Sequence, residues 1–178
     1  MNDLKYPIGE FEPQTEITVT ERQELIRSIA EAPARLRRAV EGLTPRQLDT
    51  PYRPEGWTVR QTVNHIADSH LNGYIRFKFA LTEDEPMIKP YEEKLWAELE
   101  DGRNTAPAVS LALLDALHQR WATLLGSLKP GDFARTTRHP QHLEWGAIPL
   151  DLLLGLYEWH GRHHTAHITS LCQRSGWL

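Results

Sequence analysis

The sequence of 178 residues predicts an all-α protein, folded as a four-helix bundle with long connections between its helices. Four long segments carry apolar residues at the spacing of an α-helix, and no segment shows a clear alternating pattern of a strand. The stretches between these segments are long and contain most of the prolines. The length suits one hydrophobic core, so we expect a single domain over residues 1–178.

The chain is expected to begin with an irregular arm over residues 1–17, which holds two prolines and a glycine. The first long helix should run from about residue 20 to residue 41. Pro33 lies inside this helix and is expected to kink it or split it in two, because proline removes a backbone donor. Residues 44–47 form a capping box with proline at the first helical position, which predicts a short turn of helix.

The second long helix should open at a capping box of Thr58 and Gln61 and continue to about residue 81. A short helical segment is expected over residues 91–100, and the third long helix over residues 110–128. Residues 129–147 contain proline and glycine and predict a loop with room for a short hairpin. The final helix should span about residues 149–174, since Gly176 follows as a C-terminal stop.

The composition favours a soluble, cytoplasmic protein that binds neither nucleic acid nor membrane. The formal charge is −4 and the pI about 6.1, and there is no basic run of the kind that binds nucleic acid. No apolar run approaches the roughly 20 residues that span a bilayer, and the first residues lack the apolar stretch of a signal peptide. Cys172 is the only cysteine, so no internal disulfide can form and a packing role is expected.

The final helix carries four histidines within eight residues, and this cluster is the strongest functional signal in the chain. Residues four apart on a helix lie one above the other, which pairs His160 with His164 and His163 with His167. At about 100° per residue, the first pair falls on the apolar stripe of this helix. Burying two unpaired imidazoles is costly, whereas a bound metal would satisfy both. The pattern therefore predicts a metal site, with His163 and His167 at the surface or beside the ligands.

A catalytic zinc usually takes three protein ligands and a water, so a third ligand is needed. The second long helix offers His65 and His70. Periodicity favours His70, which lies on the apolar stripe, whereas His65 lies on the polar side of the helix. The residues alone leave this choice open. Three other histidines are weaker candidates. His118 lies on the third long helix and is expected to be exposed or hydrogen-bonded. His139 and His142 lie in the following loop, where His139 can line the site.

Several short motifs are spread over essentially the whole chain and are specific as a set. They are Tyr6-Pro7-Ile8-Gly9, Gly56-Trp57-Thr58-Val59-Arg60-Gln61, His65-Ile66-Ala67-Asp68-Ser69-His70, Tyr74-Ile75-Arg76-Phe77-Lys78, Lys89-Pro90-Tyr91, Leu117-His118, Arg120-Trp121, Trp159-His160 and His167-Ile168. Together these motifs resemble those of the YfiT-like metal-dependent hydrolases of the DinB-like superfamily.

This resemblance implies a four-helix bundle that binds one divalent metal ion per chain, zinc for preference and nickel as the second choice. It implies that three histidines hold the ion, at the positions of His65, His160 and His164, and it replaces the preference of the periodicity for His70. It also implies a homodimer. The resemblance does not supply a substrate, since relatives in the superfamily include thiol S-transferases that use bacillithiol, mycothiol or glutathione.

An ion held by three imidazoles would lower the pKa of bound water from about 15.7 to near 7, and would equally favour a bound thiolate. Zinc proteases place a general base directly after the first histidine, in His-Glu-x-x-His, but here that position is Gly161. Asp68 and Glu158 are the nearest carboxylates in sequence. Asp68 follows His65 by one helical turn and is the candidate catalytic residue, although a solvated carboxylate fits the same position.

The sequence therefore leaves three functions open. The first is a metal-dependent hydrolase acting on a small-molecule substrate, as the resemblance implies. The second is a metal-dependent thiol S-transferase, which the missing glutamate favours and which would use a low-molecular-weight thiol. The third is a non-enzymatic metal-binding scaffold. Three arginines on the predicted helices are candidates to anchor an anionic substrate: Arg60, Arg76 and Arg162.

Overall fold

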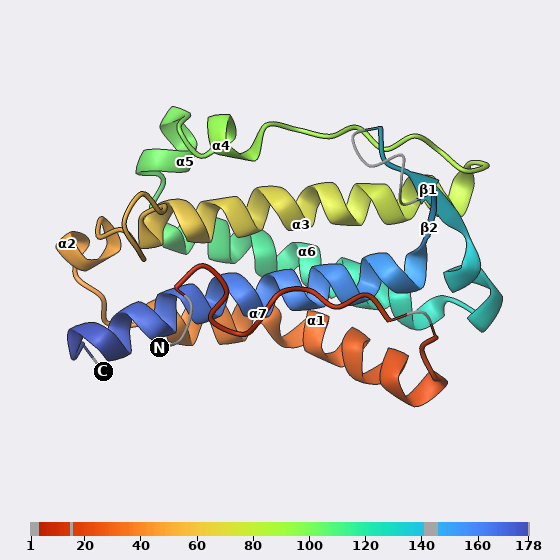
Figure 1. The fold of residues 1–178 in the computed structure, drawn as a ribbon, viewed down its shortest axis with the longest axis horizontal. Coiled ribbons are helices and arrows are strands. Elements are labelled where there is room, and N and C mark those ends of the chain that lie inside the picture. The colour runs from red at the N-terminus through yellow and green to blue at the C-terminus, as the bar shows by residue number, and fades with distance from the viewer. Residues whose placement is uncertain (1–3, 15, 141–145, 178) are drawn as a thin grey trace.

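The structure is a computed structural model that describes residues 4–14, 16–140 and 146–177. In this part of the chain, four long helices lie side by side (Figure 1). They are α1 (Val19–Val40), α3 (Val59–Thr82), α6 (Pro107–Ser127) and α7 (Leu150–Ser175). The predicted all-α class and the four-helix bundle are confirmed, and each long helix begins and ends within about three residues of its predicted bounds.

Capping boxes set where the helices begin. The Gln61 backbone N–H donates to the Thr58 hydroxyl at 3.1 Å, and the Thr58 backbone N–H donates to the Gln61 side chain at 3.0 Å. The predicted box at Thr44 likewise opens α2 (Pro45–Leu48). A third capping box, at Thr18, opens α1 just before the predicted start of this helix. In each case the side chains satisfy backbone donors that the first helical turn leaves unpaired.

The shorter elements differ from the sequence prediction in detail. Pro33 does not split the first helix, because α1 continues through this buried residue without a break. The short helical segment predicted over residues 91–100 is α4 (Glu93–Trp96), and a second short helix, α5 (Glu100–Asn104), follows where a loop was predicted.

The loop before the last helix holds a short 3₁₀ helix, η1 (Pro130–Ala134), and a pair of short strands. Strand β1 (Thr136–Arg138) pairs antiparallel with β2 (Ala147–Pro149). The predicted room for a hairpin is therefore used by these two strands.

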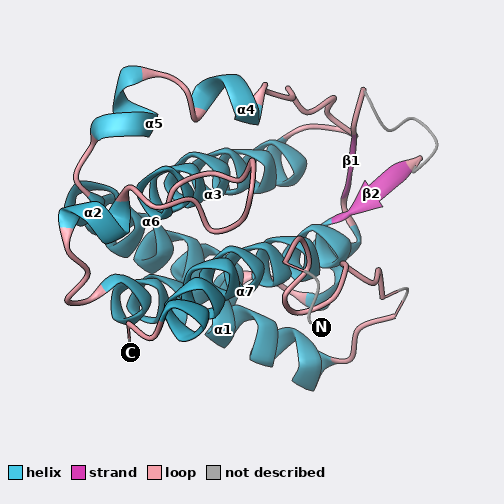
Figure 2. Ribbon diagram, turned by 60° about the vertical axis from the view of Figure 1, so that its left-hand side comes forward, coloured by secondary structure: helices cyan, strands magenta, loops and turns pink. Residues whose placement is uncertain are grey.

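The order of the helices around the bundle explains the long connections. Helices α1 and α3 each pack against both α6 and α7, so α1 lies diagonally opposite α3. Figure 1 shows α3 and α6 running in one direction, and α1 and α7 in the other. Because α3 and α6 are parallel neighbours, the chain between them must return along the bundle, and it carries α4 and α5 over α3 (Figure 2). This arrangement fixes the connectivity that the sequence left open.

The core consists of two apolar clusters at opposite ends of the bundle. One is built around residues such as Leu36, Val63, Leu114 and Ile168, and the other around Ile29, Phe77, Trp121 and Leu154. Buried histidines of α3, α6 and α7, among them His70, His118 and His164, fall between these two clusters, and His65 lies beside Val63 at the level of the first. A layer of imidazoles thus crosses the middle of the core, where each polar atom needs a partner.

The N-terminal arm packs along α7, as Figure 1 shows, and its described residues form neither helix nor strand, as predicted. The Phe11 ring lies against the Trp159 ring, and the Lys5 carbonyl accepts a hydrogen bond from His167. The arm therefore covers one face of the last helix. None of the described helices has the length and apolar character needed to cross a bilayer.

Gly73 allows close packing in the centre of the bundle. A Cβ at this position would lie 2.7 Å from the Tyr157 ring and 2.8 Å from the Trp121 ring. We expect Gly73→Ala to lower the free energy of unfolding by about 1–3 kcal/mol, because both rings would have to move. In Gly126→Ala, the control on α6, the new methyl group meets nothing within 4 Å, and we expect a gain of about 0.5–1 kcal/mol. Urea unfolding measures both, and equal stability of the two variants would contradict this packing.

Candidate metal centre

The structure brings together the three histidines that the resemblance selects. His65 lies in the second turn of α3, and His160 and His164 lie one turn apart on the antiparallel α7. One nitrogen from each ring lies within 4.8 Å of those of the other two. The Nε2 atoms of His65 and His160 are 3.3 Å apart. Two nitrogens that bind one tetrahedral zinc at 2.0–2.1 Å lie about 3.4 Å apart, so this spacing suits a shared ion.

The protonation of these rings also suits a metal ion. Burial lowers the pKa of His65 to about 4. The pKa values of His160 and His164 are lowered well below 6.5, first by burial and then by the neighbouring histidines. All three rings are therefore neutral at pH 7 and keep a lone pair for a ligand bond. The buried Nδ1 of His164 has no hydrogen-bond partner, which is costly without a bound group.

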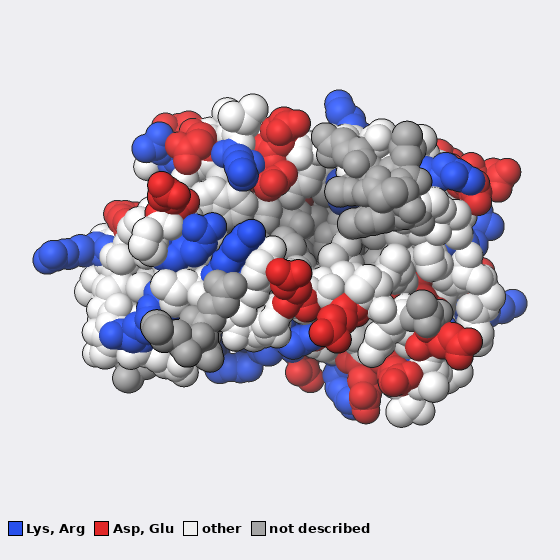
Figure 3. Space-filling model, viewed as in Figure 1, with Lys and Arg blue, Asp and Glu red and all other residues white. Residues whose placement is uncertain are grey.

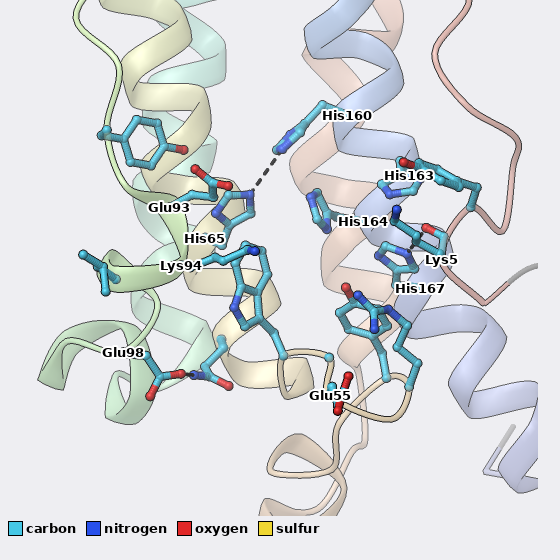
Figure 4. A pocket seen from close by; sticks show the side chains of 18 of the residues that line it. Lys5, Glu55, His65, Glu93, Lys94, Glu98, His160, His163, His164 and His167 are labelled. Atoms are coloured by element: carbon cyan, nitrogen blue, oxygen red, sulfur yellow. Dashed lines mark hydrogen bonds between the residues drawn. The ribbon is translucent and has the colours of Figure 1, made fainter. Parts of the chain in front are cut away.

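The three rings line a cavity of about 1020 Å³ between α3 and α7. Figure 4 shows His65 facing the histidines of α7 across this cavity, with the side chains of α4 on one side and Lys5 of the arm on the other. Acidic and basic side chains are intermixed on the face seen in Figure 3. The side chains that line the cavity must therefore determine whether it prefers anionic or cationic ligands.

His163 and His167 are more buried than a surface position would be, with 6% and 3% of each residue exposed. The His163 ring stacks on Trp159, and the His167 ring stacks on Tyr52 at 4.0 Å between centroids. The expectation of a surface position is wrong, because the arm and the loop at Tyr52 cover this face of α7. Both histidines line the cavity beside the three predicted ligands.

The other candidate histidines are distributed around the site. His70, which the periodicity favoured, is completely buried behind His160 and bonds to His118 at 2.8 Å. His118 was expected to be exposed or hydrogen-bonded, and it is buried and hydrogen-bonded to the Ile29 carbonyl. His139 lines the cavity, as the loop prediction allowed, and His142 lies outside the described residues.

Asp68, the candidate catalytic residue, is not among the described residues that line the cavity. Burial, followed by the charge of Asp101, raises its pKa to about 6. Asp101 belongs to α5, which packs over α3, so Asp68 faces the returning chain instead of the histidines. A spacing of three residues turns this side chain about 60° away from His65, which accounts for the difference.

Only one of the three candidate arginines lines the cavity. Arg60 pairs with Asp49, and Arg162 pairs with Glu158. Arg76 lines the cavity and donates to the Tyr157 hydroxyl at 2.8 Å.

Sequence reasoning missed several other lining residues because they lie in loops or short helices. The sequence offered a signal only for Tyr6 and Tyr91, which stand in the motifs quoted above. The missed residues include Tyr6, Tyr52, Arg53, Tyr91 and Glu93.

The chain is similar to known proteins over nearly its whole length. The sequence profile of the DinB superfamily matches residues 28–168 of this chain. The Bacillus subtilis (strain 168) protein named "Putative metal-dependent hydrolase YfiT" is 52% identical over 175 residues, which cover 98% of this chain and 97% of that protein. A Bacillus mycoides (strain KBAB4) protein, also named as a "putative metal-dependent hydrolase", is 53% identical over 177 residues. These cover 99% of this chain and 100% of that protein.

A solved structure of YfiT from Bacillus subtilis is similar to the structure of this chain, with a TM-score of 0.95 and 51% identity. The match covers 98% of this chain and 99% of that one. That structure is described as a probable metal-dependent hydrolase with an unusual four-helix bundle topology.

Removing one of the three central imidazoles should abolish stable metal binding. We expect the wild-type chain, freed of any affinity tag, to bind one zinc ion at micromolar zinc, and His160→Ala to retain none after desalting. His139→Ala is the control, because His139 lines the same cavity outside the group of three. Elemental analysis gives the stoichiometry. Zinc retained by His160→Ala would contradict the site.

The buried histidines should make the metal-free protein less stable as the pH falls from 7 to 5. Histidines in the unfolded chain bind protons near pH 6.5, whereas burial lowers the pKa of His65, His118 and His163 to about 4. The unfolded state therefore binds more protons in this window, and the free energy of unfolding falls by at most about 1.4 kcal/mol per pH unit for each such histidine.

Asp68 acts in the opposite direction over the same window, because its pKa is raised to about 6, but it is one group against several. Urea unfolding at pH 7, 6 and 5 measures the balance. Stability that stays level or rises toward pH 5 would contradict the burial of neutral imidazoles.

Proposed function

Because this chain belongs to the DinB superfamily, we propose that it is a metal-dependent hydrolase whose single divalent ion, zinc for preference, is held by His65, His160 and His164. The observation that carries this proposal is the open set of three neutral imidazoles on the wall of a large cavity. Among the described residues, no fourth histidine, cysteine or carboxylate belongs to this group. Structural zinc sites use four protein ligands, whereas an open position is typical of a catalytic site.

A divalent ion at this position would supply acidified water, with a pKa near 7. The protein must then supply a proton acceptor. Of the three carboxylates that line the cavity, Glu98 accepts hydrogen bonds from Gln61 and Arg103. Figure 4 shows Glu55 at one end of the cavity and Glu93 on the side that α4 forms, and both line this cavity with His65.

We assign the role of general base to Glu93, because its side chain is exposed at the cavity wall and no described residue donates a hydrogen bond to its carboxylate. It replaces Asp68 in this role. It also supplies, from another segment, the carboxylate that is missing beside His160 at Gly161.

The substrate that this cavity suits best is a small anion. Arg53 and Arg76 line the cavity, and neither has a carboxylate partner among the described residues. The Nε atom of each is buried without a hydrogen-bond partner. A carboxylate or phosphate on the substrate would satisfy these donors and offset the cost of their burial.

Thiol S-transfer is the second candidate function, and the same arginines favour it. A low-molecular-weight thiol that carries carboxylates would present its anionic groups to Arg53 and Arg76 and its sulfur to the ion. The two functions differ in whether water or a thiol attacks the substrate, and in both the attacking group must first give up a proton to an acceptor such as Glu93 or solvent.

A parallel substrate screen tests the proposed function. Zinc-loaded protein is assayed with esters, amides and phosphoesters in water, and with electrophiles in the presence of glutathione, cysteine or bacillithiol. We expect turnover in water, strongest with anionic substrates and lost in His164→Ala. Turnover that requires a thiol would select the transferase. If zinc binds but neither series shows turnover, the enzymatic functions would be contradicted and a non-enzymatic metal-binding scaffold would be favoured.

Replacing Glu93 should separate metal binding from catalysis. On any substrate that the screen identifies, we expect Glu93→Gln to lower kcat by about 10²–10⁴-fold, since the general base is lost, while zinc affinity is unchanged. Glu55→Gln is the matched control at the far end of the same cavity. Equal kcat values for the two variants would remove Glu93 from the mechanism.

A further inference from the structure

Behind the three histidines, a line of hydrogen bonds leads from His160 to the opposite side of the bundle. His160 Nδ1 lies 3.4 Å from His70 Nε2, and His70 Nδ1 lies 2.8 Å from His118 Nε2. His118 Nδ1 lies 2.6 Å from the carbonyl oxygen of Ile29. This histidine chain, made of His160, His70, His118 and the Ile29 carbonyl, takes one member from each of the four long helices.

The carbonyl at the end of the histidine chain sets the direction of every bond in it. A carbonyl oxygen only accepts, so His118 must carry its hydrogen on Nδ1. A neutral imidazole has one N–H, which leaves His118 Nε2 to accept from His70 Nδ1. By the same step, His70 Nε2 accepts from His160 Nδ1. The Nε2 atom of His160 is then left with a free lone pair, and this atom faces His65.

The two inner rings hold a single hydrogen each because their burial outweighs the charge of Asp115, which acts on His118. His70 is 0% exposed and His118 is 1% exposed, and neither has a hydrogen bond to a carboxylate among the described residues. Burial is the largest cause that lowers the pKa of both rings, to about 4 for His118. The Trp121 and Tyr157 rings meet His70 edge to face, each 5.9 Å away, and limit its rotation.

Gly161 provides a second, independent observation. A Cβ at this position would lie 3.2 Å from Cε1 of His70, closer than most real contacts. The missing side chain therefore leaves room for His70 to reach His160. This explains physically why the position that holds glutamate in His-Glu-x-x-His is a glycine in this chain.

We propose that the Ile29 carbonyl, acting through His118 and His70, fixes His160 as the Nδ1–H tautomer and so presents its Nε2 lone pair to the metal. This inference rests on the proposed metal site. His70 and His118 are positioning residues, since they touch neither the ion nor the substrate. Without them the hydrogen of His160 could occupy either nitrogen, and in the Nε2–H form it would have to leave Nε2 before a metal ion could bind there.

Imidazole ¹⁵N NMR on the full-length chain tests the proposal directly. We expect His70, His118 and His160 to carry their hydrogen on Nδ1 in the metal-free protein, and to keep it there after zinc is added. Hydrogen on Nε2 of His160 or His70 in the metal-free protein would overturn the proposal. If zinc does not bind at all, the proposed function fails, whereas the metal-free tautomers still decide the direction of the histidine chain.

A matched pair of variants gives a second measurement. In His118→Gln the amide oxygen can still accept from His70, whereas His118→Met has a similar shape and no such acceptor. We expect zinc affinity, measured by competition with a chelator, to fall about 10–100-fold in His118→Met and to stay nearer the wild type in His118→Gln. Equal loss in both, or no loss in His118→Met, would overturn the proposal.

Leu125→Ala controls for the loss of stability alone. Leu125 is buried on the same helix as His118, about two turns further along, and its apolar side chain makes no hydrogen bond to the histidine chain. We expect this variant to unfold at lower urea and to bind zinc as the wild type does. If it also loses zinc affinity, the effect of His118→Met would be one of stability and would not support the proposal.

Discussion

The structure depends on one constraint, the burial of a layer of uncharged imidazoles between two apolar clusters. Removing these rings from water lowers their pKa values and keeps them neutral, as for His70 and His118. Neutral rings still need a partner at each nitrogen. The bundle supplies a backbone carbonyl at one end of the layer, at Ile29, and a position for a cation at the other, where His65, His160 and His164 meet.

The topology of the bundle turns this layer into a site with access to small molecules. Because α3 and α6 are parallel neighbours, the connection between them returns over α3 and contributes α4 to the cavity wall. The N-terminal arm covers α7 and contributes Lys5 and Tyr6 on the other side. The long helices thus hold the imidazoles and Arg76, while the connecting segments provide Arg53 and Glu93, which we assign to substrate binding and proton transfer. Changes in those segments could alter specificity without disturbing the core.

Sequence alone predicted what depends on local chemistry. Helical periodicity and capping boxes gave the four long helices, and the stripe of α7 selected His160 and His164. Periodicity preferred His70 to His65 because it reports which side of a helix is buried and not which neighbour lies there. The same limit explains why the surface alternative for His163, which the arm covers, was wrong, and why Asp68 faces α5 and not the cavity. The resemblance supplied His65, since it carries information on contacts between segments distant in sequence.

The most direct test of the central claim is X-ray absorption spectroscopy of the zinc-loaded protein, with and without an anionic substrate. We expect three imidazole nitrogens at about 2.0–2.1 Å from the zinc ion and one exchangeable oxygen ligand, whose signal changes when substrate binds. A shell of four protein ligands that ignores substrate, or one with fewer than three imidazoles, would contradict the claim.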